Sequence, residues 1–185
     1  MNTLRYFKTL EAKDRLRADK SEGLAASYPA AKMKISVGGH EIRNLVGQVR
    51  FGHPDEEHIA IMSFYAITDL NLDVVVDDRA LGFGDTAVVI TDGPRFIELL
   101  SRECERRSWK WQSGLVDYVD KDTHQGDMGA FRKYSDLSYQ SEFRIAVRTG
   151  RGGPIEDLYL GDLSSLTETC EASELKEFIK IKKEA

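Results

Sequence analysis

The chain has 185 residues, of which 41% are hydrophobic and 31% charged, a composition typical of one globular domain and not of a disordered or fibrous chain. Thirty-one acidic residues against 26 basic ones give a formal charge of −5, which argues against non-specific binding of duplex nucleic acid by the surface as a whole. The sequence has no apolar run of about 20 residues, no apolar segment within residues 1–8 and only two cysteines, so we expect a cytoplasmic protein that contacts no membrane.

Alternating and β-branched residues in the first half of the chain indicate strands. A helix over residues 10–20, with Thr9 as its cap, interrupts them, and Gly38-Gly39 predicts a hairpin turn. The run at residues 58–65 is apolar enough for a central strand with both faces covered. The strands expected in this half lie at residues 4–8, 33–37, 41–51, 58–65 and 69–77.

The second half contains the clearest helix, at residues 94–107, where Pro94 suits the first turn and the apolar residues recur at helical spacing. We expect strands at residues 86–90, 109–119, 137–149 and 155–160, and a C-terminal helix at residues 173–183. Strands outnumber helices and cluster in hairpins. The sequence therefore predicts an α+β fold, a mainly antiparallel, split sheet with flanking helices, in a single domain over residues 1–185.

Two patterns that resemble functional motifs are better explained as turns or loops. Residues 82–87 fit the spelling G-x-G-x-x-A of a dinucleotide fingerprint, but a strand follows them where a helix N-terminus would have to receive the pyrophosphate. His53 and His58 flank three acidic residues, yet their spacing fits no standard zinc site. We therefore expect no metal site.

A basic patch extends from the end of the predicted helix at residues 94–107 into the next predicted strand. Cations next to tryptophans can hold single-stranded nucleic acid, because bases stack on the indole rings. The alternative is a solvated helix end whose cations complement the negative end of the helix dipole. The candidate residues for nucleic-acid binding are Arg102, Arg106, Arg107, Trp109 and Lys110.

The segment Tyr139-Gln140-Ser141-Glu142-Phe143-Arg144 is the most informative in the chain. In a strand, Gln140, Glu142 and Arg144 would share one face, so a rigid element would present a carboxamide and a carboxylate together. The alternative is an exposed strand face with an ion pair of little energetic weight.

This segment resembles the Q-x-E motif of mono-ADP-ribosyltransferases of the arginine–serine–glutamate class. That class also has an arginine on an early strand and a serine on a middle strand, for which the sequence offers Arg5 and Ser63 in the right order. The chain further resembles a broad bacterial and phage protein family, through the F-G-D segment at residues 83–85, the segment from Tyr139 to Arg144 and the L-G-D-L turn at residues 160–163.

The resemblance implies a function and a role for each residue. NAD would be the co-substrate and Glu142 would steady the oxocarbenium-like centre, with Ser63 holding Glu142 and Gln140 beside the acceptor. Arg5 would pair with the cofactor phosphates, and Tyr6, Phe64 or Tyr65 could stack on a ring of the cofactor.

The resemblance thus favours a bacterial or phage effector or toxin that modifies a protein or nucleic acid, with an antitoxin or host protein as a possible partner. Two alternatives remain open: a non-catalytic protein-binding or inhibitor module in phage–host conflict, and a single-stranded nucleic-acid binder.

Overall fold

The structure is a computed structural model, and it describes residues 1–10, 19, 21–68 and 76–179. Its centre is a four-stranded sheet in the order β1 (Asn2–Thr3), β6 (Ile59–Tyr65), β12 (Glu142–Arg148) and β8 (Lys110–Leu115), with every neighbouring pair antiparallel. Residues 58–65 were predicted as a central strand, and β6 confirms this, because it lies between β1 and β12. The fold is α+β, as predicted.

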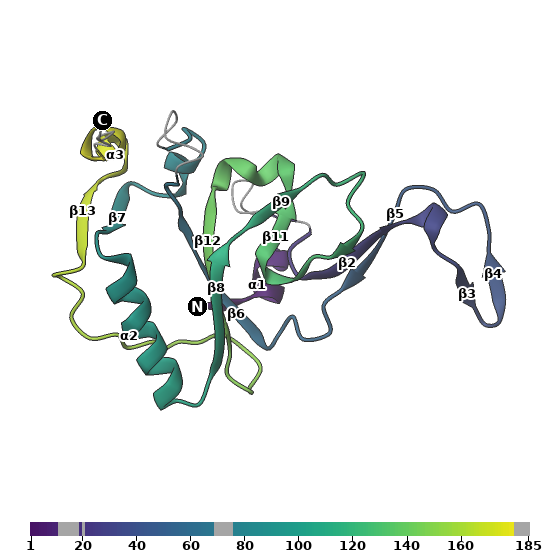
Figure 1. The fold of residues 1–185 in the computed structure, drawn as a ribbon, viewed down its shortest axis with the longest axis horizontal. Helices are drawn as coiled ribbons and strands as arrows, with labels where there is room; N and C mark the ends of the chain where they lie inside the picture. The colour runs from purple at the N-terminus through teal and green to yellow at the C-terminus, as the bar shows by residue number, and fades with distance from the viewer. Residues whose placement is uncertain (11–18, 20, 69–75, 180–185) are drawn as a thin grey trace.

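One face of this sheet packs against α2 (Gly93–Arg106), as Figure 1 shows. The helix begins at the Asp92 cap, whose side chain accepts the Arg95 amide at 3.0 Å, and it has a proline in its first turn. Its buried residues Phe96, Leu100 and Cys104 meet Ile145 and Val147 of β12 in the main hydrophobic core. Trp109 and Trp111 are half-buried against the same core, so apolar packing accounts for both indoles.

The opposite face carries α1 (Leu4–Thr9), which is capped by Thr3 and buries Leu4 against Ile59 and Ile61. The prediction of a strand over residues 4–8 is wrong: only Asn2–Thr3 is extended. The Thr3 hydroxyl accepts the Tyr6 amide at 3.2 Å, and this cap starts a helix where hydropathy alternation had suggested a strand.

Smaller units surround the sheet (Figure 1). A long hairpin of β2 (Leu24–Pro29) and β5 (Gln48–Gly52) is extended by a second hairpin, β3 (Ile35–Val37) and β4 (His40–Ile42), and β10 (Gly126–Asp127) pairs with β2. β9 (Asp117–Val119) and β11 (Arg132–Tyr134) are parallel. β7 (Thr86–Ile90) and β13 (Thr167–Glu171) form a separate antiparallel pair, followed by α3 (Leu175–Phe178). Single 3-10 turns lie at Ala30–Lys32, Ala80–Phe83, Gly129–Phe131, Ser135–Gln140 and Ala172–Glu174.

Several predicted boundaries require correction. Residues 137–140 are not strand, because the chain forms a 3-10 turn at Ser135–Gln140 and Ser141 has a left-handed backbone (φ 39°) before β12 begins. Residues 155–160 form no strand, whereas β7 has the predicted bounds and is half-exposed. The predicted helix at residues 173–183 is α3 with a preceding 3-10 turn, as far as residue 179. The predicted helix at residues 10–20 and strand at residues 69–77 lie almost entirely outside the described residues.

Candidate functional site

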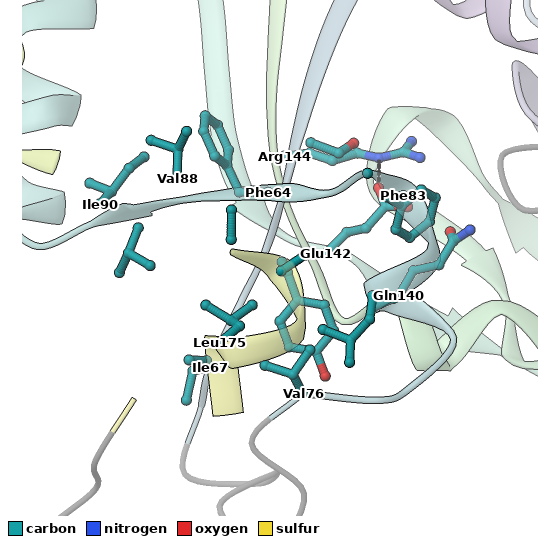
Figure 2. A pocket seen from close by; sticks show the side chains of 18 of the residues that line it. Phe64, Ile67, Val76, Phe83, Val88, Ile90, Gln140, Glu142, Arg144 and Leu175 are labelled. Atoms are coloured by element: carbon teal, nitrogen blue, oxygen red, sulfur yellow. Dashed lines mark hydrogen bonds and ion pairs between the residues drawn. The ribbon is translucent and has the colours of Figure 1, made fainter. Parts of the chain in front are cut away.

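A cavity of about 710 Å³ lies at the carboxyl end of β6, between the main sheet, the β7–β13 pair and α3 (Figure 2). Most of its wall is apolar. Ile67, Val76 and Leu175 contribute to that wall in the view of Figure 2. One end is polar instead. The polar residues that line this end are Glu22, Ser63, Lys133, Gln140, Glu142 and Arg144.

The strand register explains why three of these residues meet. Arg144 pairs with Ser63 and Glu142 pairs with Tyr65 across the antiparallel strands, and side chains directly opposite each other lie on the same face. Ser63 and Glu142 are therefore diagonal neighbours. Phe64 lies on the other face, where its ring meets that of Phe96 edge-on at 5.5 Å, and it also reaches the cavity.

Gln140 reaches the same place by a different route from the one predicted. It lies in the 3-10 turn before β12, so the argument from a shared strand face does not hold for it. Its carboxamide oxygen nevertheless accepts a hydrogen bond from Lys133 Nζ at 2.6 Å, and the same Nζ lies 2.5 Å from Glu142 Oε1. A lysine on β11 thus brings the two residues of the Q-x-E motif together.

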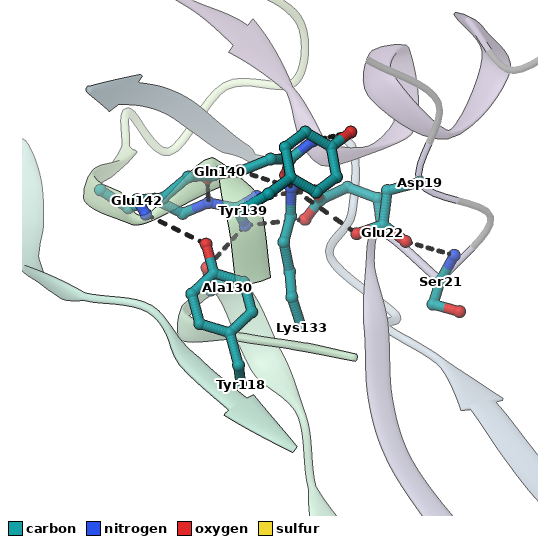
Figure 3. A network of polar contacts seen from close by, with 10 residues as sticks. Asp19, Ser21, Glu22, Tyr118, Ala130, Lys133, Tyr139, Gln140 and Glu142 are labelled. Atoms are coloured by element: carbon teal, nitrogen blue, oxygen red, sulfur yellow. Dashed lines mark hydrogen bonds and ion pairs between the residues drawn. The ribbon is translucent and has the colours of Figure 1, made fainter. Parts of the chain in front are cut away.

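Five buried charged residues form a cluster beneath the polar end of the cavity (Figure 3). We call it the charge cluster; it comprises Asp19, Glu22, Lys133, Glu142 and Arg144. Each is at most 7% exposed, and burial at this level is costly for a charge without a partner. The three acids and two bases therefore have to neutralise one another.

Arg144 holds the cluster together. Its guanidinium donates two hydrogen bonds to Glu22, at 2.9 and 2.8 Å, one to Glu142 Oε2 at 2.6 Å and one to the carbonyl oxygen of Ala130 at 2.8 Å. Burial by itself would lower the pKa of Arg144, but the adjacent carboxylates outweigh it and raise that pKa further. Arg144 is therefore always charged.

Glu142 is ionised for the same reason. Burial would raise the pKa of this carboxyl, but Arg144 and Lys133 more than compensate and lower it to about 2. The Glu142 amide also donates to the Tyr118 hydroxyl at 3.0 Å, which fixes the start of the strand. The carboxylate is thus rigid and negatively charged at neutral pH.

Among the residues that the structure describes, Asp19 is the acid of the cluster without a close cation. Lys133 Nζ is 3.8 Å from its Oδ2, and its Oδ1 accepts the Ser21 amide at 2.8 Å. Burial and the negative charge of Glu22 raise the pKa of Asp19 to about 6. This carboxyl therefore takes up a proton in mildly acidic solution, which removes the excess negative charge of the cluster.

Two residues proposed for the cofactor lie elsewhere. Arg5 is on α1, where its guanidinium pairs with the exposed Glu57, and it does not line the cavity. Tyr6 is 43% exposed, and its neighbour Phe7 lines the cavity instead. Tyr65 does line the cavity, and its hydroxyl accepts the Asp77 amide at 3.1 Å.

The basic patch on α2 is mostly paired with acids of its own helix. Arg102 contacts Glu98, while Arg106 and Arg107 contact Glu103 at 2.8 and 2.5 Å. The Arg107 guanidinium also stacks over Trp109 at 4.7 Å. Lys110 lies apart from them, in a shallow hollow that it lines with Arg148.

Sequence patterns did not indicate a role for Glu22 or Lys133. Neither belongs to a motif, and they lie 120 and 9 residues from Glu142 in the chain. Lys133 follows Arg132, and two adjacent basic residues are typical of an exposed surface. One signal was available: Arg144, on the same face as Glu142 in a strand with a buried apolar set, required an acidic partner from elsewhere.

The fold and the cavity define this chain as an α+β protein with a polar-ended cavity beside a buried charge cluster. Comparisons with protein-family models, curated proteins and solved structures found no match. Within the described residues, no helix has both the length and the apolar character needed to cross a membrane.

Proposed function

We propose that the cavity binds NAD and that the protein transfers ADP-ribose from it to a macromolecule, with Glu142 as the catalytic carboxylate. One observation carries the proposal. Ser63, Gln140 and Glu142, which the resemblance selects from sequence alone, line the same cavity although 79 residues separate the first from the last.

The dimensions and lining of the cavity suit such a ligand. Small-molecule sites usually enclose about 300–1,000 Å³ and are mainly apolar, with a few polar groups that fix orientation. The cavity, with 710 Å³ and apolar walls, suits the adenine and nicotinamide rings of NAD. The hydroxyl of Ser63 and the carboxylate of Glu142 suit the ribose hydroxyls. Arg79 and Lys176, whose neighbours Ala80 and Leu175 line the cavity, are cations beside it. They pair with Asp77 and Asp78, and the phosphates of the ligand would take the place of these two carboxylates.

Glu142 has the properties that the reaction requires. Transfer breaks the bond between ribose C1 and nicotinamide, which leaves with the electron pair, and forms a bond from C1 to an acceptor that loses a proton. A carboxylate held rigid by Lys133 and Arg144 is oriented before positive charge develops at the sugar, so it stabilises the transition state without reorganisation. Ser63, exposed to the cavity on the neighbouring strand, helps to position the ribose.

We further propose that the protein is a bacterial or phage effector or toxin acting in a cytoplasm. A reducing compartment suits Cys104 and Cys170, which are both free. Its target would be a protein or nucleic acid, and an antitoxin or host protein could be its partner.

A second candidate, a ligand-binding module without turnover, is favoured by one observation. Both carboxylate oxygens of Glu142 are already within hydrogen-bonding distance of a cation, Oε1 of Lys133 and Oε2 of Arg144. These two cations partly neutralise the carboxylate of Glu142, which leaves less negative charge to stabilise an oxocarbenium-like centre. NAD binding without release of nicotinamide supports this candidate and contradicts transfer.

The test measures nicotinamide release and label transfer from labelled NAD in a host lysate. We expect Glu142→Gln to lower both by about 100-fold or more, the scale of a lost electrostatic stabiliser. Glu105→Gln, an exposed position on α2, serves as the matched control and should leave both unchanged.

Because Glu142→Gln also disturbs the charge cluster, Ser63→Ala provides an independent variant whose exposed side chain has no role in that cluster. We expect it to reduce release by about 10-fold with an unchanged melting temperature. Wild-type protein that neither releases nicotinamide nor transfers label overturns the transfer proposal.

A further inference from the structure

The long hairpin that leaves the body of the molecule is basic and has an uncovered apolar face. We call residues 24–52 the arm; it contains β2, β3, β4 and β5 and stands out at one end of the longest axis in Figure 1. Residues 31, 32, 34, 36–44, 46 and 47 are all exposed. The arm carries four basic side chains and one acidic one, a net charge of +3, whereas the rest of the chain carries −8.

The register gives the outer part of the arm two different faces. Ile35 pairs with Ile42 and Val37 with His40, so these side chains share a face, on which Val37 is 65% and Ile42 43% exposed. Lys34 and Arg43 stand immediately before and after the paired residues. An isolated two-stranded ribbon is only marginally stable in water, and an exposed apolar face adds nothing to its stability. Such a face is typical of a contact with another surface.

The opposite end of the molecule is acidic. We call β13, the turn Ala172–Glu174 and α3 the acidic end; its glutamates Glu168, Glu171, Glu174 and Glu177 are all exposed. The sequence from residue 156 to residue 185 carries eight acidic and four basic residues, a net charge of −4. Val88, which is 62% exposed, pairs with Thr169 of β13, and Thr86 pairs with Glu171. Val88 and Glu171 therefore share the exposed face of this strand pair.

We propose that two copies of this chain form an antiparallel dimer in which the arm of each lies on the acidic end of the other. The two surfaces have opposite charge, the arm exposes Val37, and Val88 of β7 is exposed beside the acidic end. They lie at opposite ends of the longest axis (Figure 1), so a two-fold axis perpendicular to it brings both pairs together at once. The two contacts are identical by symmetry, so the dimer buries twice the area of one contact. A standard stable interface buries ~1,600 Å² in total.

This inference does not depend on the proposed function. The acidic end borders the cavity through Ala172 and Leu175, so the arm of the second copy would lie beside the cavity mouth.

The test is the molecular mass in solution, by light scattering after size exclusion at about 100 µM protein and about 0.1 M salt. We expect twice the 20.9 kDa mass of one chain. The arm variant Lys34→Glu/Arg43→Glu and the end variant Glu171→Lys/Glu174→Lys should each dimerise at least ~10-fold more weakly, because each places like charges at both contacts. An equimolar mixture of the two should regain the dimer, because both contacts then join opposite charges.

Two controls make the result specific. Arg102→Glu/Arg151→Glu changes the net charge as much as the arm variant does but lies outside both surfaces, so it should remain dimeric. Melting temperatures should change by less than about 3 °C, since all substituted side chains are exposed. A monomeric wild-type protein at this concentration overturns the proposal, and so does a mixture of the two variants that stays monomeric.

Discussion

Replacing Arg144 with methionine should destabilise the protein far more than the same change four residues later, at Arg148. Methionine fills much of the volume of the arginine stem but provides no donors. Glu22 then loses both hydrogen bonds, at 2.9 and 2.8 Å, and Glu142 keeps only Lys133. Breaking a buried ion pair from one side costs about 3–5 kcal/mol, because the remaining charge is buried without its partner.

Arg148→Met is the matched control. Arg148 is on the same strand and the same face, but its side chain is 46% exposed and makes one ion pair, with Asp55 at 3.0 Å. An exposed pair of this kind contributes about 0–1 kcal/mol. The two variants lose the same chemical group and differ in burial, so their difference measures the contribution of the cluster.

Urea unfolding followed by the fluorescence of Trp109 and Trp111, half-buried in the main core, measures both free energies of unfolding. For a chain of this length, 1 kcal/mol corresponds to about 2–4 °C, so Arg144→Met should lower the melting temperature by about 6–20 °C and Arg148→Met by at most about 4 °C. Equal and small losses for the two variants would refute the idea that Arg144 neutralises the buried acids.

Three further predictions concern the same elements. The pKa of Asp19 is about 6 in the folded state and near 4 in the unfolded state, so the free energy of unfolding should fall by up to about 3 kcal/mol as the pH rises from about 4 to about 6. In chemical unfolding experiments, Asp19→Asn should abolish this decline and should be more stable than wild type at about pH 8. Leu100→Ala, at a fully buried position on α2, should cost about 2–5 kcal/mol in the same unfolding assay, and a loss below 1 kcal/mol would contradict the packing described. Arg5→Ala, on an exposed pair with Glu57, should leave the free energy of unfolding within about 1 kcal/mol of wild type and NAD turnover unchanged, whereas a large loss of turnover would return Arg5 to the site.

Periodicity predicted the parts of the fold that hydrophobic burial dictates. The central strand β6, the helix α2 and the β3–β4 hairpin follow from an apolar run, helical spacing after a proline and a Gly-Gly turn. The alternating pattern at residues 4–8 predicted a strand where a helix forms. The helix is favoured because the hydroxyl of Thr3 caps its N-terminus and because Leu4 packs in the core. The strand prediction also failed at residues 137–140, where a left-handed residue, Ser141, separates a 3-10 turn from the strand.

The candidate site was predictable only in part. Ser63 and Glu142 could be placed together because each lies on a strand, and one register brings them to the same face. Glu22 and Lys133 could not, since long-range pairing of buried charges leaves no local pattern in the chain. The pairing itself is a consequence of burial: a strand that carries both Glu142 and Arg144 on a covered face needs further charges to balance them.

Calorimetric titration of NAD into the protein tests the central claim most directly. Ala87 lines the cavity, and Ala87→Trp would place an indole inside it; Thr169→Trp adds the same group at an exposed position on the paired strand. We predict saturable binding to wild type and to Thr169→Trp, and at least ~10-fold weaker binding to Ala87→Trp. No binding to wild-type protein, or equal affinity for all three, would contradict the claim that this cavity is an NAD site.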